Sequence, residues 1–403
     1  MTREEVYSEC LTKLEKSDFL LLELATGMGK TKQAIDIINH LVKTKYQGKH
    51  TSMLLLVAKI VHKQTWKDEF KKWGGINVDD LTIECYESLK KHEYESFDFV
   101  VMDECHHLHS DKRLDLFSTL TYGHVIGLSA TIPKKLKQYF QYEYAAEVVT
   151  CSIVDAIEDE VLPEPQIILY PLQLDSTRPT ESIEVNPKAK GKTYYGNYNE
   201  LWKYRKMKVH AIISCTPRQR VNEYNSQILY EKNRYMRTRQ DFLKNKWLFD
   251  CGERIKYLAN LKNNIVLSIL QRLEKERTIT FCKTIEQADI LGKYSIHSKN
   301  KDSDIIYNNF NAKKINHIVS VNVLNEGANL VDCKYAVFAN YSSSEICSAQ
   351  RVGRSLRHKS PVIILPYYEA TREEEIVNTM IENFKEESIH TIHSLKELDE
   401  LIQ

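Results

Sequence analysis

The chain has 403 residues, of which 42% are hydrophobic and 28% are charged, and its formal net charge is +1. This is globular composition with room for two to three domains, and no apolar run approaches the 18 or so residues that a membrane span needs. The start of the chain has no signal-peptide layout, and the nine cysteines form no C-x-x-C pair. We therefore predict neither a zinc site nor a disulfide framework, and expect a reducing cytoplasm, bacterial or that of a phage-infected host.

The first motif is L-A-T-G-M-G-K-T at residues 24–31, between an apolar run at 19–22 and an amphipathic stretch at 33–42. A strand, a glycine turn and a helix that opens with Lys-Thr can cradle a triphosphate, because the glycines let backbone N–H groups approach the anion. Lys30 would reach the outer phosphates and Thr31 would hold Mg²⁺. Ala25 replaces the usual first glycine of the pattern, so partners downstream must decide the assignment. The predicted nucleotide-binding residues of this loop are Thr26, Gly27, Met28, Gly29, Lys30 and Thr31.

Further strands are predicted at residues 53–58, 81–85, 97–102 and 124–128, with a helix at 61–73. Trp66, Phe70 and Trp73 recur at helical spacing in that helix, which favours core packing over a ligand site. Strands that alternate with helices predict a parallel sheet covered on both faces. Chemistry in such sheets gathers at the carboxyl ends of the strands.

Asp103 and Glu104 follow one of these strands directly. The aspartate can hold Mg²⁺, and the glutamate can polarise a water for attack on the γ-phosphate. The alternative for this pair alone is a solvated loop. The neighbouring Cys105, His106, His107 and His109 would crowd a metal and have no second ligand pair, so we expect no structural metal there. We expect His106 to join a polar network that links two domains.

Pro163-Glu164-Pro165 predicts a hinge, and residues 166–174 predict one more strand. Alternation resumes near residue 264, with strands at 278–282, 317–321, 335–339 and 361–366, so a second α/β unit without a phosphate loop is expected. The predicted boundaries are 1–162 for the first domain, 163–174 for the hinge and first strand of the second, 175–262 for an insertion, and 263–403 for the rest of the second domain.

Residues 188–277 carry 21 lysines and arginines against 8 aspartates and glutamates. A basic segment on an otherwise acidic chain points to a polyanion, and the alternative is a solvated helix face. Aromatic side chains in such a segment can stack bases for about 1–3 kcal/mol each. The candidates for such stacking are Trp202, Tyr204, Tyr235 and Trp247, of which Trp247 is expected in a core. The candidate nucleic-acid contacts are Arg234, Arg237, Arg239, Lys244 and Lys246.

The stretch Q-R-V-G-R-S-L-R at residues 350–357 places arginines three apart on a predicted helix, where they point the same way. Fixed guanidinium groups suit a transferring phosphoryl group, and an arginine finger can contribute about 10³–10⁵ in rate. The alternative is a basic helix face.

Together these stretches resemble superfamily 2 helicases. Residues 25–31 look like motif I, 55–59 like motif Ia, D-E-C-H at 103–106 like a D-E-x-H motif II, 129–131 like motif III, 323–330 like motif V and 350–357 like motif VI. The form of motif VI and the compact length look most like XPB-type DNA helicases and UvsW-type helicases of tailed phages, which suggests a phage-encoded protein.

The resemblance implies two RecA-like parallel-sheet domains with a basic, mainly helical insertion. We expect a monomeric motor that uses ATP and Mg²⁺. It implies nucleotide and metal binding by Lys30, Thr31 and Asp103, with Glu104 as the catalytic base. Coupling to nucleic acid would involve His106, Ser129, Ala130 and Thr131, and Lys59 would contact the strand. Arg354 and Arg357 would be the fingers, Gln350 would face the same interface, and Gly327 would line the junction of nucleotide and strand.

Two departures leave alternatives open. The family usually has a glutamine upstream of motif I that reads adenine, yet no glutamine precedes Gln33, so base selectivity is loose or depends on Tyr7 or main chain. The D-E-C-H spelling also occurs in RNA-directed members. A DNA helicase or branch-remodelling translocase is the favoured reading, with an RNA helicase or RNA-stimulated ATPase second. A duplex-sensing ATPase without unwinding is third, and a restriction translocase subunit is disfavoured because no room remains for a nuclease domain.

Overall fold

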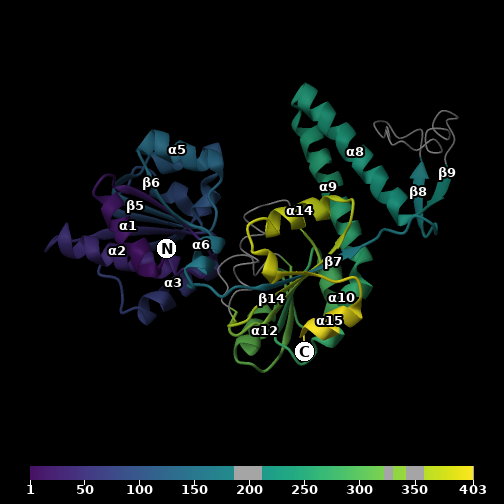
Figure 1. Cartoon of the computed structure of the whole chain (residues 1–403). Coiled ribbons are helices and arrows are strands. Elements are labelled where there is room, and N and C mark those ends of the chain that lie inside the picture. The colour runs from purple at the N-terminus through teal and green to yellow at the C-terminus, as the bar shows by residue number, and fades with distance from the viewer. Residues whose placement is uncertain (186–210, 322–329, 342–357, 403) are drawn as a thin grey trace.

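The computed structural model describes residues 1–185, 211–321, 330–341 and 358–402. Two parallel β-sheets lie in separate lobes, and a pair of long helices projects from the second lobe (Figure 1). The α/β class with two parallel-sheet domains is thereby confirmed. Among the described helices, none is both long and apolar enough to cross a membrane.

The first lobe is built on six parallel strands in the order β3-β2-β4-β5-β1-β6. Their apolar runs are almost continuous because a parallel sheet is buried on both faces. The strand that precedes the glycine turn, β1, is separated by β5 alone from β4, the strand that ends in the aspartate of D-E-C-H. The bounds are β1 (Phe19–Leu24), β2 (Ser52–Val57), β3 (Asp80–Cys85), β4 (Ser96–Asp103), β5 (Thr121–Ser129) and β6 (Glu147–Cys151).

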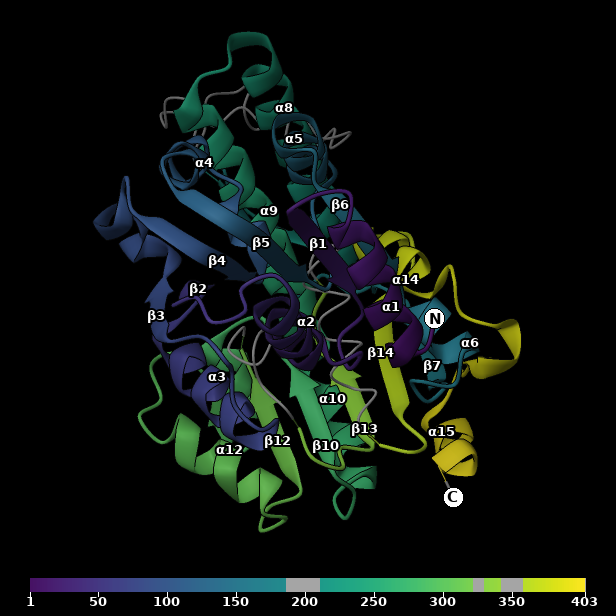
Figure 2. The ribbon, with the colours of Figure 1, turned by 90° about the vertical axis from the view of Figure 1, so that its left-hand side faces the viewer.

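Helices cover both faces of this sheet. Side chains of α1 (Arg3–Leu14), α2 (Lys30–Thr44) and α3 (Ile60–Lys72) share one apolar cluster with the strands, and Figure 2 shows these helices on one side. The opposite cluster contains Phe117 and Phe140 from α4 (Asp111–Ser118) and α5 (Lys134–Tyr144). The chain leaves the lobe through α6 (Ile153–Glu158).

The second lobe holds seven strands in the order β11-β12-β10-β13-β14-β7-β15. Directly after Pro165 the chain enters this sheet as β7 (Gln166–Leu172), which pairs in parallel with β14 (Val362–Tyr368). The other strands are β10 (Thr278–Phe281), β11 (Ser295–Ile296), β12 (His317–Ser320), β13 (Tyr335–Phe338) and β15 (Ile389–Thr391). The helices are α10 (Asn263–Arg272), α11 (Ile285–Leu291), α12 (Ser303–Asn311), α14 (Arg372–Ile381) and α15 (Leu395–Ile402).

Between β7 and α10 lie a two-stranded antiparallel sheet and a helical hairpin. The sheet pairs β8 (Glu181–Val185) with β9 (Ala211–Cys215). The hairpin consists of α8 (Pro217–Thr238) and α9 (Asp241–Leu261), which pack side by side (Figure 1). Thr216 and Gln219 form a capping box at the start of α8, and Arg239 ends it in the left-handed conformation. We call α8 and α9 the helical hairpin.

A buried ion pair fixes the base of the helical hairpin to the second lobe. Lys262, between α9 and α10, is fully buried, and its Nζ lies 2.5 Å from Glu373 Oε1. Glu373 Oε2 accepts a hydrogen bond of 3.1 Å from the Tyr368 backbone, and the lysine lies 4.6 Å from the Tyr341 ring centre. Burial lowers the pKa of Lys262 below its ordinary value. The attachment of the hairpin to the second lobe therefore depends on both residues of this pair.

Glu373→Leu is expected to destabilise the second lobe by about 3–5 kcal/mol, because it leaves the Lys262 charge buried without its partner. The double variant Lys262→Met, Glu373→Leu removes both charges and should lose less. Urea unfolding, monitored by hydrogen exchange of the second lobe, measures both changes in stability. A loss below about 1 kcal/mol in the single variant, the scale of an exposed pair, would contradict this role.

Candidate nucleotide site

The glycine turn joins β1 to α2 in a backbone conformation that favours glycine. Gly27 has φ +106° and Gly29 has φ +83°. The conformation therefore favours glycine, and a Cβ at Gly27 would also lie 2.7 Å from Leu162 Cδ2 and would displace that side chain. Gly29 is the N-cap of α2 and Lys30 is its first residue. The unsatisfied N–H groups of the first turn of α2 therefore open at this loop, as an anion site needs.

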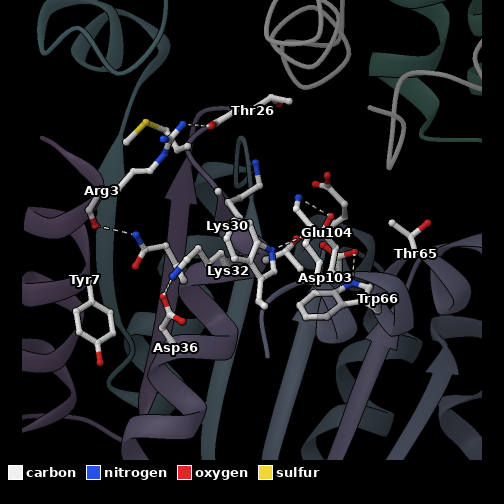
Figure 3. Close-up of a pocket in the computed structure, with 18 of the residues that line it drawn as sticks. Arg3, Tyr7, Thr26, Lys30, Lys32, Asp36, Thr65, Trp66, Asp103 and Glu104 are labelled. Atoms are coloured by element: carbon white, nitrogen blue, oxygen red, sulfur yellow. Dashed lines mark hydrogen bonds and ion pairs between the residues drawn. The ribbon is translucent and has the colours of Figure 1, made fainter. Parts of the chain in front are cut away.

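Lys30 and Thr31 stand at the mouth of the loop. Lys30 Nζ donates a hydrogen bond of 3.0 Å to the Leu24 carbonyl at the end of β1. Neither side chain is part of the buried core. Figure 3 shows Lys30 between the loop and the Asp103–Glu104 pair. The order of the two residues thus brings an ammonium group and a hydroxyl group to the same end of the helix.

Arg3 and Gln33, which the sequence did not predict as site residues, connect the N-terminal helix α1 to the loop and to α2. Arg3 donates from Nη2 to the Gly27 carbonyl over 3.1 Å, and Gln33 Nε2 donates to the Arg3 carbonyl over 2.7 Å. Both bonds are drawn in Figure 3. They connect α1 to α2 across 24 to 30 residues of chain, which no local pattern reveals.

One cavity of about 660 Å³ brings these elements together. This volume lies in the range of ligand sites, about 300–1,000 Å³. Tyr7, the candidate reader of the base, lines the cavity, and its pKa is raised by burial and by Asp36. The lining from α1 and α2 includes Arg3, Glu4, Tyr7, Gln33 and Asp36; the lining from α3 includes His62, Trp66, Glu69 and Trp73; the loop, Lys30, Thr31, Asp103 and Glu104 complete it.

The two acidic residues of D-E-C-H have different surroundings. Asp103 Oδ2 accepts a hydrogen bond of 2.9 Å from Trp66 Nε1, and the Asp103 carbonyl accepts one of 2.8 Å from the Tyr86 hydroxyl. Glu104 is 8% exposed and has φ 51° and ψ 57°. A non-glycine residue in this left-handed region costs about 1–3 kcal/mol, and such strain concentrates at functional sites. The turn directs the Glu104 carboxyl toward the end of β5.

A polar triangle connects Glu104 to the residues after β5. His106 Nδ1 lies 3.0 Å from Ser129 Oγ and 3.4 Å from Glu104 Oε2, and Ser129 Oγ lies 3.5 Å from the same carboxyl oxygen. Ser129 Oγ also bonds to the Thr131 carbonyl and backbone nitrogen, at 2.8 and 3.3 Å, around Ala130. Within the described residues, His106 thus joins D-E-C-H to the 129–131 turn of the same lobe.

The donor set at this cavity fits Mg²⁺ that arrives with a nucleotide. Mg²⁺ is bound by one or two carboxylates together with substrate phosphates rather than by an all-protein cage, and the cavity offers the Asp103 carboxylate and the Thr31 hydroxyl. Across the described ranges, no group of three or more His, Cys, Asp and Glu side chains is placed to hold a metal. Cys105 is fully buried, and burial raises the pKa of its thiol.

The remaining predicted site residues divide into three groups. Gly327, Gln350, Arg354 and Arg357, like Trp202 and Tyr204, lie outside the described residues. Lys59 is exposed at the N-cap of α3.

On the helical hairpin, Arg234 and Lys246 both pair with the buried Glu231, at 3.1 and 2.8 Å. Arg237, Arg239 and Lys244 are exposed near its tip. The five predicted nucleic-acid contacts of the hairpin are therefore not equivalent.

Two protein-family models match the chain. Residues 2–134 match "Type III restriction enzyme, res subunit", and residues 261–359 match "Helicase conserved C-terminal domain". The type I restriction enzyme EcoAI endonuclease subunit of Escherichia coli is 29% identical over 191 residues, which is 40% of this chain and 23% of that relative. QP509L of African swine fever virus (isolate Pig/Kenya/KEN-50/1950), a candidate ATP-dependent RNA helicase, is 30% identical over 131 residues, 27% of this chain and 24% of that relative.

The chain spans about a quarter of the length of these curated relatives. The fold is similar to ATP-dependent Type ISP restriction-modification enzyme LlaBIII bound to DNA, with a TM-score of 0.57 and 14% identity over 100% of this chain and 32% of that chain. It is also similar to S. cerevisiae Dbp5 bound to RNA and ADP BeF3, with a TM-score of 0.58 and 10% identity over 99% of this chain and 92% of that chain. These likenesses show the fold. Together the two matched domains, carried on a pair of RecA-like sheets, indicate a superfamily 2 helicase.

Proposed function

We propose that this chain is an ATP-driven motor on nucleic acid, a DNA helicase or translocase. One observation carries the proposal: a single cavity is lined by the glycine turn, Lys30, Thr31, Asp103 and Glu104. These are the parts that phosphoryl transfer needs, because its catalysis is mostly positioning and charge neutralisation. ATP and Mg²⁺ are the cofactors, and the Mg²⁺, when bound, neutralises charge that develops on the phosphates.

Each residue of the cavity then has a defined task. Lys30 and the N–H groups at the start of α2 hold the outer phosphates, and Thr31 and Asp103 hold the metal. Glu104 orients the attacking water and accepts its proton. Ser129 and His106, which lie within 3.5 Å of Glu104 Oε2, keep this carboxyl in place. A movement of the Glu104 carboxyl would be transmitted through the 129–131 turn to the surface that contacts nucleic acid.

The second lobe supplies the other half of the proposed motor. Arg354 and Arg357 act as arginine fingers, Gln350 faces the same interface, and Gly327 lines the junction of nucleotide and strand. These roles rest on the resemblance of residues 323–330 and 350–357 to motifs V and VI. ATP closes the two lobes and hydrolysis reopens them, so each cycle steps the protein along a phosphate backbone, where Lys59 contributes one contact.

The basic helical hairpin favours a nucleic-acid duplex or fork as the substrate. Its exposed cations and its half-buried stack of Tyr235 on Trp247, with ring centres 6.1 Å apart, suit a phosphate backbone and base faces. RNA is the second candidate, because one relative carries the name of an RNA helicase. ATPase assays with single-stranded DNA, forked DNA and RNA separate the two. A strand-displacement assay separates a helicase from an ATPase that binds a duplex without unwinding it.

Replacing Arg237, Arg239 and Lys244 together by glutamine should lower the salt dependence of DNA binding. Each phosphate contact contributes about 0.9 to the slope of log K against log salt, so the slope should fall by about 2–3. Fluorescence anisotropy with a labelled fork at several salt concentrations measures it. ATP binding should not change, because the hairpin does not line the cavity.

The matched control replaces Lys16, Lys49 and Lys314, three exposed lysines outside the hairpin, and has the same change in net charge. Its slope should stay near that of the wild type. Equal slopes in the two triple variants would contradict direct contact by the hairpin. Arg234 and Lys246 are left intact, because their loss would unbalance the buried Glu231.

A further inference from the structure

The indole of Trp66 makes a contact that its place in an apolar stripe does not explain. Trp66 lies two turns into α3, is 2% exposed, and packs against Phe70 with ring centres 5.5 Å apart. A buried tryptophan N–H needs an acceptor, because leaving a buried donor unpaired costs free energy. The acceptor is Asp103 Oδ2, at 2.9 Å, and the contact is drawn in Figure 3.

Two neutral donors hold Asp103 from different elements. Trp66 binds the side-chain carboxylate, and the buried hydroxyl of Tyr86 binds the main-chain carbonyl at 2.8 Å. An indole N–H is neutral, so it can fix the direction of a carboxylate without cancelling its charge. A lysine at the same place would cancel that charge. A carboxylate that must bind a divalent cation needs a fixed orientation.

We propose that Trp66 is a positioning residue for the metal-binding Asp103. The proposal rests on the nucleotide site proposed above. It assigns to α3 a task beyond packing: its second turn fixes the rotamer of the carboxylate at the end of β4. Groups that hydrogen-bond to metal ligands typically contribute about 10–100-fold in metal affinity. Because phosphates share the binding of Mg²⁺, we expect the lower end of this range.

The same helix provides an internal control. Trp73, the C-cap of α3, lines the same cavity and donates from Nε1 to Glu69 Oε2 at 2.6 Å. The ammonium groups of Lys32 and Lys72 lie 5.2 and 4.6 Å from its ring centre. No hydrogen bond between Trp73 and Asp103 is found among the described residues. Trp73→Phe therefore makes the same chemical change in the same helix away from the carboxylate.

The test measures metal binding without catalysis. Trp66→Phe keeps a buried ring and removes the N–H. In the presence of saturating ADP, Mn²⁺ should bind about tenfold more weakly to Trp66→Phe than to the wild type. Electron paramagnetic resonance measures this binding. The affinity for the fluorescent analogue MANT-ADP in EDTA should stay within about twofold, since the Trp66 N–H donates to the metal ligand Asp103. Trp73→Phe should match the wild type in Mn²⁺ affinity, because its N–H donates to Glu69 and not to Asp103.

Three results would overturn the proposal. The first is a Mn²⁺ affinity of Trp66→Phe equal to that of the wild type. The second is an equal loss of Mn²⁺ affinity in Trp73→Phe. The third is a parallel loss of metal-free MANT-ADP affinity in Trp66→Phe, as a packing defect requires. If Trp66→Phe does not fold, benzothienylalanine at position 66 replaces the N–H by sulfur in a ring of nearly the same shape, and the same outcomes decide. Failure of the wild type to bind MANT-ADP would instead contradict the proposed nucleotide site.

Discussion

Lys30→Ala is expected to abolish ATP turnover and to leave the fold intact. The Lys30 ammonium lies at the start of α2, 3.0 Å from the Leu24 carbonyl, where it would meet the outer phosphates. Loss of one preorganised donor to developing charge lowers turnover by about 10²–10³-fold, and the loss of a full positive charge should exceed this. Phosphate release at saturating ATP measures the rate, and circular dichroism and thermal unfolding report the fold.

Lys32→Ala is the matched control for this variant. Lys32 belongs to the same turn of α2 and lines the same cavity, but its ammonium pairs with Asp36. It should therefore turn over ATP at nearly the wild-type rate. Normal turnover by Lys30→Ala would end the assignment of this loop as the ATP site.

Glu104→Gln is expected to retain ATP binding and to lose turnover by about 10²–10⁴-fold, the range for a general base. Glutamine keeps the size of the side chain and a similar tolerance of the left-handed backbone at this position. It cannot accept the proton of the attacking water. Single-turnover hydrolysis measures the chemical step, and MANT-ATP binding shows that the site is still formed.

Glu69→Gln provides the comparison for Glu104→Gln. Glu69 lines the same cavity but binds Trp73 and Lys72, at 2.6 and 3.3 Å. Its replacement should leave the chemical step near the wild-type rate. If Glu104→Gln hydrolysed ATP as fast as Glu69→Gln, another group would have to be the base.

The parts of the fold that were predictable are those whose signal is local. The strands β1, β4 and β5 are short apolar runs that end in the glycine turn, in D-E-C-H and in Ser129 respectively, and parallel order brings their carboxyl ends to one edge. The strands β11 and β15, of two and three residues, exist through pairing with neighbours and carry no pattern of their own. The sequence therefore predicted the central strands and the edge strand β3, but not the edge strands β6, β11 and β15.

The site divides in the same way. The phosphate loop and D-E-C-H are continuous in sequence, so their residues could be named. Trp66 was expected in the core and is buried there, but its hydrogen bond to Asp103 depends on how α3 lies across the end of β4. The latch of Arg3 and Gln33 on the loop likewise depends on the packing of α1 against α2.

The helical hairpin shows what charge counting leaves out. Net charge identifies a basic segment, but the pairing of α8 with α9 decides that Lys246 reaches Glu231, which also binds Arg234 one turn along α8. Trp247 was expected in a core. It is half-buried against Tyr235 and lies under Lys232 at 5.8 Å, because a two-helix hairpin has no third layer to cover it.

The rate of ATP hydrolysis by the wild-type chain, measured with and without forked DNA, single-stranded DNA and RNA, tests the central claim most directly. A motor of the proposed kind hydrolyses ATP slowly alone and faster with nucleic acid, with the largest stimulation by DNA, and Lys30→Ala shows no stimulation. Hydrolysis that no nucleic acid changes, or that persists in Lys30→Ala, would contradict the account.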